Sequence, residues 1–264
     1  MNTVIIAIIS ITLIGACCAA LLSVAAKVMH VAVDERITQI NALLPGTNCG
    51  ACGFPGCSGY ASAIVEDPNV KTNLCTPGGD SVVSGISEIM GVDGEAAESK
   101  VAVLHCGGDN DAQKRKMDYT GIKTCIAATG VHRGENACGY GCLGYGDCLE
   151  ACPVDAICMV NGLARINRNL CSGCGLCVAA CPHKLIRIQN KDSKTIVACN
   201  NIEKGGVARK KCTKCCIGCN RCAKECSEGA IVIENNLAII DADKCTDCGH
   251  CVELCPTKCI VSYD

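Results

Sequence analysis

The sequence predicts an α+β protein in four parts: a transmembrane helix, a small α-rich domain and two tandem units of short paired strands and helices. Three observations predict this architecture. Residues 2–26 carry no charged side chain. Cysteine makes up 29 of the 264 residues, and most cysteines fall into regularly spaced groups. One of these groups starts at Cys171 and recurs 74 residues later at Cys245, within a longer internal repeat.

The amino-terminal segment, residues 1–27, is predicted to be a transmembrane helix. About 20 consecutive apolar residues suffice to span a bilayer as a helix. A signal peptide would begin with a basic region and have a shorter apolar stretch, whereas a buried helix of a soluble domain remains the alternative. The first basic residues are Lys27 and Arg36. The positive-inside tendency therefore places the domains that follow in the cytoplasm, with the chain in the cell membrane as a single-pass protein.

Residues 28–100 are predicted to form a small domain and a linker. Four cysteines in this segment have the spacing C-x2-C-x4-C-x17-C: Cys49, Cys52, Cys57 and Cys75. Glycines between the first three allow the backbone to pass close to a bound group. We expect a short helix over residues 60–66 and a second helix over 81–90. The four thiols can ligate one [4Fe–4S] cluster, with a structural zinc site as the alternative.

The two clearest motifs have the spacing C-x2-C-x2-C-x3-C-P, which is the ferredoxin run for [4Fe–4S] clusters. They consist of Cys171, Cys174, Cys177 and Cys181 before Pro182, and Cys245, Cys248, Cys251 and Cys255 before Pro256. In two-cluster ferredoxins the cysteine before proline ligates the cluster of the partner run. Zinc sites more often use two separated C-x2-C pairs. These runs indicate electron transfer, and their thiolates indicate a reducing compartment.

The internal repeat aligns residues 125–186 with residues 199–260 without a gap, which predicts two ferredoxin-like units over 101–190 and 191–264. Each unit should hold two clusters. In the second unit the ligands are Cys216, Cys219, Cys222 and Cys255 for one cluster, and Cys226, Cys245, Cys248 and Cys251 for the other. In the first unit the regular cluster uses Cys152, Cys171, Cys174 and Cys177.

The second cluster of the first unit lacks one ligand. Cys142, Cys148 and Cys181 are in place, but Tyr145 occupies the position that matches Cys219. Cys106, Cys125 and Cys138 are the candidates for the missing ligand, and Cys138 is preferred because it is nearest in sequence. The remaining cysteines near the units then predict a sixth cluster, with ordinary buried thiols as the alternative. Its ligands would be Cys106, Cys125, Cys199 and Cys212, leaving Cys17, Cys18, Cys158, Cys215 and Cys259 free.

Other functions find little support. Residues 139–144 fit G-x-G-x-x-G, but no βαβ unit surrounds them and a predicted ligand lies inside them. There is no P-loop or other nucleotide or flavin motif. The net charge is −2, so nothing in the overall charge suggests nucleic acid. No catalytic residue is predicted.

The segment that joins the two units is basic, with Asp192 and Glu203 as its acidic residues. It contains Lys184, Arg187, Lys191, Lys194, Lys204, Arg209, Lys210, Lys211 and Lys214. Such a surface beside clusters would steer an acidic electron donor, although a solvated loop explains the charge equally well.

The order of these motifs resembles the B subunits of Rnf complexes, the membrane-bound ferredoxin:NAD⁺ oxidoreductases that pump Na⁺ or H⁺. The resemblance is carried by the apolar amino-terminal segment, the motif from Cys49 to Cys57 with Cys75, and the ferredoxin runs. It covers essentially the whole chain, and the second unit resembles the longer members of the family.

The resemblance implies an electron-transfer subunit that accepts electrons from reduced ferredoxin and passes them to membrane and flavin/NAD subunits. Its cofactors would be five [4Fe–4S] clusters, with a sixth predicted as above. Two alternatives stay open: a cluster-carrying subunit of another membrane oxidoreductase, and a non-redox scaffold for zinc or cluster assembly. The sequence does not determine the coupling ion.

Overall fold

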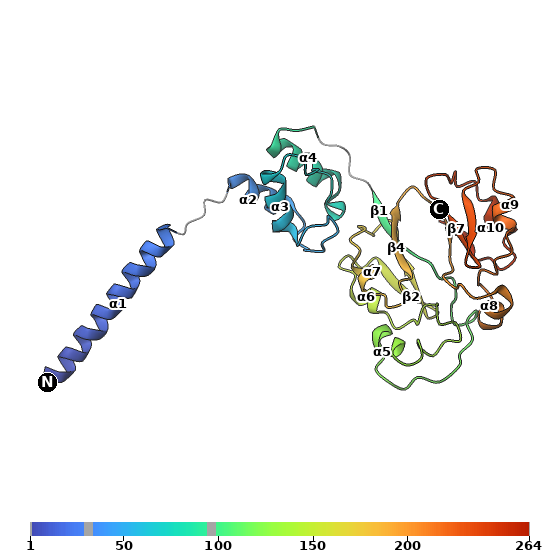
Figure 1. The fold of residues 1–264 in the computed structure, drawn as a ribbon, viewed down its shortest axis with the longest axis horizontal. Helices are drawn as coiled ribbons and strands as arrows, with labels where there is room; N and C mark the ends of the chain where they lie inside the picture. The colour runs from blue at the N-terminus through green and yellow to red at the C-terminus, as the bar shows by residue number, and fades with distance from the viewer. Residues whose placement is uncertain (1, 29–33, 94–98, 264) are drawn as a thin grey trace.

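A computed structural model describes residues 2–28, 34–93 and 99–263 (Figure 1). It shows a long amino-terminal helix, a small helical domain and a body that contains all of the described strands. The predicted linker after residue 93 lies largely outside the described residues.

The amino-terminal helix α1 covers Asn2–Val28. Its large apolar side chains are exposed wherever they are described, for example Ile6 at 64%, Leu13 at 70% and Leu22 at 70%. Among the helices of the described residues, none was found to combine the length and apolar character that crossing a membrane requires.

The small domain packs three helices around one apolar core. They are α2 (Glu35–Leu43), α3 (Cys57–Glu66) and α4 (Gly79–Met90), with a short 3₁₀ helix, η1, at Thr76–Gly78. Asp34 caps α2 by accepting a hydrogen bond from the Arg36 N–H, and α4 ends at Gly91 in the left-handed conformation that favours glycine. The core includes Ile40, Tyr60 and Ile86. The helices expected over residues 60–66 and 81–90 are both present.

The body contains two units of similar construction. The first has an antiparallel pair of β1 (Lys100–Leu104) and β4 (Ile186–Asn190) and a hairpin of β2 (Ile157–Val160) and β3 (Leu163–Ile166). The second has the matching pair of β5 (Thr195–Val197) and β8 (Ile260–Ser262) and a hairpin of β6 (Ile231–Glu234) and β7 (Leu237–Ile240). In each unit, the first strand therefore pairs with the last strand.

Short helices carry or follow the cysteine runs. In the first unit these are α5 (Cys125–Thr129), α6 (Asp147–Glu150) and α7 (Leu176–Ala180). In the second unit they are α8 (Gly205–Lys211), α9 (Arg221–Lys224) and α10 (His250–Leu254). Five of these six helices contain a cysteine, and α8 ends at the residue before Cys212.

Cysteines take part in the core of each unit. The core of the first unit combines Leu104, Leu163 and Ile186 with Cys177, and that of the second combines Val197, Ile231 and Ile260 with several thiols. A further apolar cluster joins the units through Val101 and Val103 of β1 and Ile196 of β5. The two first strands thus hold the units together.

Candidate iron–sulfur sites

In the small domain, Cys49 and Cys52 lie in the loop before α3, Cys57 begins α3, and Cys75 directly precedes η1. Asn48 accepts a hydrogen bond from the Cys57 N–H at 2.8 Å and so fixes the start of α3 against the loop. Burial raises the pKa of the Cys75 thiol, and the neighbouring Cys52, Cys57 and Cys49 raise it further. The four predicted cysteines of this domain are therefore brought together. Their donor set, four thiols, suits an iron–sulfur cluster.

The regular site of the first unit gathers the four cysteines that the ferredoxin run predicts. Burial raises the pKa of Cys177 to about 12, with further contributions from Cys171, Cys174 and Cys152. Backbone N–H groups already point at two of the sulfurs. The Ala102 N–H donates to Cys171 Sγ and the Ala156 N–H to Cys152 Sγ, both at 3.3 Å. Such donors stabilise thiolate sulfur and tune the potential of a bound cluster.

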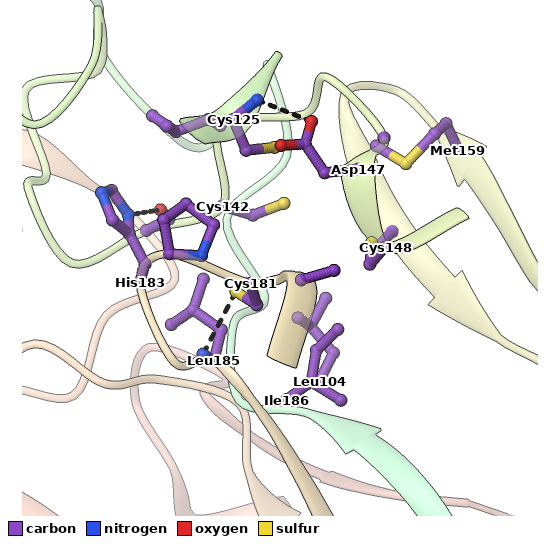
Figure 2. A pocket seen from close by; sticks show the side chains of 16 residues that line it. Leu104, Cys125, Cys142, Asp147, Cys148, Met159, Cys181, His183, Leu185 and Ile186 are labelled. Carbon is purple, nitrogen blue, oxygen red and sulfur yellow. Dashed lines mark hydrogen bonds between the residues drawn. The ribbon is translucent and has the colours of Figure 1, made fainter. Parts of the chain in front are cut away.

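The irregular site of the first unit is a cavity lined by four thiols (Figure 2). They are Cys125, Cys142, Cys148 and Cys181. Burial raises the pKa of Cys148 to about 12, and the other three thiols contribute. Cys125 thus occupies the place that was expected for Cys138. Cys138 does not line this cavity.

Asp147 holds Cys125 at the cavity. Its carboxylate accepts a hydrogen bond from the N–H of Cys125 at 2.7 Å (Figure 2) and another from the N–H of Ile126 at 3.0 Å. The displaced residue, Tyr145, packs instead against Tyr119, with ring centroids 6.0 Å apart. Gly144, directly before Tyr145, has φ at +81°, and a Cβ added there would meet the Gly162 carbonyl oxygen at 2.5 Å.

The second unit has two cavities, each lined by one predicted ligand set. Cys216, Cys219, Cys222 and Cys255 line the first, together with Cys259. Cys226, Cys245, Cys248 and Cys251 line the other, together with Cys222.

A sixth group of thiols differs from the predicted one. Burial raises the pKa of Cys212 to about 11, with Cys138 and Cys215 adding to the rise. Burial also raises the pKa of Cys199 to about 11, with contributions from Cys216 and Cys138. Cys199 and Cys212 thus both lie near Cys138, whereas the sequence grouped these two cysteines with Cys106 and Cys125.

Sequence signals for these two differences exist. Cys215 follows Cys212 at C-x2-C spacing. Cys106 follows β1 just as Cys199 follows β5, so Cys106, not Cys125, is the structural counterpart of Cys199. Within the described ranges, no group of three or more His, Cys, Asp or Glu side chains is arranged to hold a metal ion. A [4Fe–4S] cube differs from a single ion in this respect, because each of its four irons takes its own thiolate.

Three family models match the chain, and all describe iron–sulfur proteins. They are "Putative Fe-S cluster" over residues 44–77, "LdpA Fe-S cluster-binding domain" over 146–192 and "4Fe-4S dicluster domain" over 216–259. These matches cover the cysteine motif of the small domain and the ferredoxin runs of both units. They support iron–sulfur binding and leave the number of clusters open.

Curated relatives match nearly the whole chain. The B subunit of the Na⁺-translocating ferredoxin:NAD⁺ oxidoreductase complex of Acetobacterium woodii is 40% identical over 90% of this chain and 72% of its own length. The B subunit of the proton-translocating complex of Clostridium ljungdahlii is 41% identical over 99% of this chain and 94% of its own length. The chain belongs to the family of Rnf B subunits.

The Rnf B subunits also include that of the ion-translocating oxidoreductase complex of Methanosarcina acetivorans, which is 37% identical over 91% of both chains. Other members of the family from Shewanella and Vibrio species match 60% of this chain. These comparisons confirm the resemblance that the motifs predicted, including the longer form. They also confirm the prediction of an iron–sulfur electron-transfer subunit of an Rnf-type oxidoreductase complex.

Proposed function

We propose that this chain carries electrons from reduced ferredoxin through a series of [4Fe–4S] clusters into an Rnf-type complex that reduces NAD⁺. The names of two relatives describe ferredoxin:NAD⁺ oxidoreductase complexes, and five groups of four thiols could supply the cluster sites here. Clusters bound at these sites would supply one-electron redox chemistry. The chain's own residues hold them, bury them and direct N–H donors at their sulfurs.

The single observation that carries the proposal is the cavity of Cys125, Cys142, Cys148 and Cys181. The ferredoxin run is broken there by Tyr145, yet a cysteine from a distant segment completes the set of four thiols. Four thiols can also hold a zinc ion, but Cys148 and Cys181 lie in a segment that matches an Fe-S cluster-binding domain, and the equivalent segment of the second unit matches a 4Fe-4S dicluster domain. The complete set therefore favours the electron-transfer function over the zinc or assembly scaffold.

The test combines spectroscopy with a measurement of electron transfer. The full chain, purified anaerobically, should show interacting [4Fe–4S]⁺ signals by electron paramagnetic resonance (EPR) after reduction with dithionite. It should also oxidise reduced ferredoxin in stopped flow. A protein with stoichiometric zinc and no such signals would exclude the proposal. Co-purification with quinone- or hydrogenase-linked subunits, rather than NADH-linked ones, would favour a different membrane oxidoreductase.

We also propose that α1 attaches the chain to the membrane, with the other domains in the cytoplasm. Its exposed apolar side chains, such as Leu13 and Leu22, support this role, as does the position of Lys27 at its carboxyl end. The full chain should sediment with membranes after cell lysis. A variant without residues 2–28 should appear in the supernatant, and sedimentation of both forms alike would contradict the proposal.

A further inference from the structure

The first strands of the two units, β1 and β5, occupy equivalent positions. Ala102 of β1 pairs with Ile188 of β4, and Thr195 of β5 pairs with Ser262 of β8. Ile188 and Ser262 are 74 residues apart, which is the period of the internal repeat. Ala102 and Thr195 are therefore structural counterparts, although both lie outside the gapless part of the repeat.

The backbone N–H groups of these two counterparts have different acceptors. The Ala102 N–H donates to Cys171 Sγ at 3.3 Å. Cys245 is the equivalent of Cys171 in the repeat, but the Thr195 N–H donates to Asp247 Oδ1 instead, at 2.7 Å. Thr195 nevertheless lines the cavity that contains Cys245. A hydrogen bond to cysteine sulfur in the first unit is therefore replaced in the second unit by a hydrogen bond to a carboxylate.

The Asp247 carboxylate is held beside the sulfur of Cys245. Its Oδ1 lies 3.8 Å from Cys245 Sγ, and its Oδ2 accepts the Lys194 N–H at 3.1 Å. Together with the hydrogen bond from Thr195, this contact fixes both carboxylate oxygens against the backbone at the start of β5. Cysteine binds iron as a thiolate, without its proton. With a cluster bound, the carboxylate charge therefore lies next to a thiolate charge.

The first unit has no room for this carboxylate. Gly173 occupies the position equivalent to Asp247, and both residues have positive φ, at +68° and +53° respectively. A Cβ added to Gly173 would meet the Lys100 carbonyl oxygen at 2.5 Å. The close approach of β1 therefore restricts this position to glycine in the first unit, whereas the second unit accommodates aspartate, which tolerates positive φ better than most residues.

We propose that Asp247 lowers the midpoint potential of the cluster held by Cys226, Cys245, Cys248 and Cys251 below that of the equivalent cluster in the first unit. Two effects act in the same direction. An N–H donor to sulfur stabilises the more negative, reduced cluster, and Asp247 takes this donor away from Cys245. The carboxylate charge itself destabilises the reduced cluster. The difference favours electron transfer from this cluster to its counterpart in the first unit, a consequence that rests on the proposed function.

The test is an EPR-monitored redox titration of the full chain, purified anaerobically. Asp247→Gly gives the second unit the glycine of the first. For one cluster, the ratio of reduced to oxidised form at a fixed ambient potential should rise about tenfold, which is about 59 mV for one electron. The other midpoint potentials should stay unchanged. Cys248→Ser removes a thiolate from the same cluster and should alter the same signal, which identifies it.

Asp247→Asn separates the charge from the hydrogen bond. Asparagine tolerates positive φ, and its amide oxygen can still accept the Thr195 N–H, so the charge beside Cys245 is lost while this acceptor remains. The potential should therefore rise, but less than in Asp247→Gly. This variant decides the question by itself where Asp247→Gly binds less iron. Asp243→Asn, which removes an exposed carboxylate two residues before the run, is the control and should leave every potential unchanged.

Unchanged or lower potentials in both Asp247 variants would overturn the proposal. These potentials are measured without ferredoxin, so the two proposals can fail separately. A raised potential in Asp247→Asn together with no oxidation of reduced ferredoxin by the native chain would count against the proposed function alone. Unchanged potentials together with normal oxidation of ferredoxin would overturn the role of Asp247 and leave the proposed function intact.

Discussion

At the scale of single residues, Cys259 shows how a thiol that is not a predicted ligand can act on a cluster site. It is 3% exposed, and its sulfur lies 3.5 Å from Cys255 Sγ. Hydrogen bonds from Cys259 lower the pKa of both Cys216 and Cys255. The corresponding residue of the first unit is Leu185, whose backbone N–H reaches Cys181 as that of Cys259 reaches Cys255. The two sites thus differ in this hydrogen-bond donor as well as in the exchange of Cys219 for Cys125.

The substitution Cys259→Leu should lower the midpoint potential of the cluster held by Cys216, Cys219, Cys222 and Cys255. A hydrogen bond to sulfur stabilises the more negative, reduced cluster. A net value of ~0.5–1.5 kcal/mol per hydrogen bond corresponds to a shift of ~20–60 mV for one electron. An EPR-monitored redox titration measures this shift. Cys158→Leu, on the exposed side of β2, is the control, and a rise in potential in Cys259→Leu would contradict the argument.

The pairing of Cys125 with the broken run makes a rescue experiment possible. Cys125→Ser should remove about four irons from the full chain, because the cavity then offers three thiols. Adding Tyr145→Cys should restore them, since Tyr145 stands where Cys219 stands in the regular run. Iron content and EPR spin quantitation check both steps. Loss of iron in Cys138→Ser with the signals of the Cys125 site unchanged would agree with this assignment, whereas full iron in Cys125→Ser would contradict it.

At the scale of elements, the cysteine runs and hairpins could be predicted because they are local. A ferredoxin run fixes its own loop and short helix, and the repeat places β2–β3 and β6–β7 at the same spacing. The first strands could not be placed this way. β1 pairs with β4 more than 80 residues later, and an insertion between Cys106 and Cys125 shifts the repeat there. The gapless match from Cys125 onwards therefore aligned Cys125 with Cys199. As a result, the sequence placed Cys138 instead of Cys125 in the irregular cavity. It also placed Cys106 and Cys125 in the sixth group, where the structure has Cys138 and Cys215.

In the small domain, one tyrosine ties α3 to the loop that leads to Cys75. The Tyr60 hydroxyl donates to the Lys71 carbonyl at 2.8 Å and accepts the Leu74 N–H at 3.2 Å. Tyr60→Phe leaves both groups without this partner, at a cost of about 1–3 kcal/mol. Hydrogen exchange at Leu74 should accelerate about 5- to 150-fold in the full chain. Tyr140→Phe in the first unit should leave Leu74 unchanged, and unaltered exchange in Tyr60→Phe would show that the hydroxyl does not hold the loop.

At the scale of the whole molecule, the cluster sites run from the small domain through both units, and the basic residues between the units lie beside several of them. In the structure, some of these basic residues form ion pairs and others are exposed. Lys211 and Lys214 are paired with Glu203 and Asp109, respectively. Lys204, Arg209 and Lys210 on and before α8 are exposed, next to the exposed apolar residues Ile202 and Val207. The surface of α8, which ends at the residue before Cys212, therefore combines exposed positive charge with apolar contact area.

This surface suits an acidic electron donor such as the ferredoxin of the proposed function. Reversing two charges, Arg209→Glu with Lys210→Glu, should slow electron transfer from reduced ferredoxin by about 10-fold or more at low ionic strength, because electrostatic steering is lost. Added salt should slow the native chain steeply but the variant only weakly, since exposed charges are screened over about 10 Å at 0.1 M salt. Stopped-flow kinetics measure both effects.

Arg221→Glu with Lys224→Glu, the same change on α9, is the matched control, and reduction by dithionite should be equal in all three proteins. Equal salt dependence in the native chain and the α8 variant would place ferredoxin docking elsewhere on the molecule.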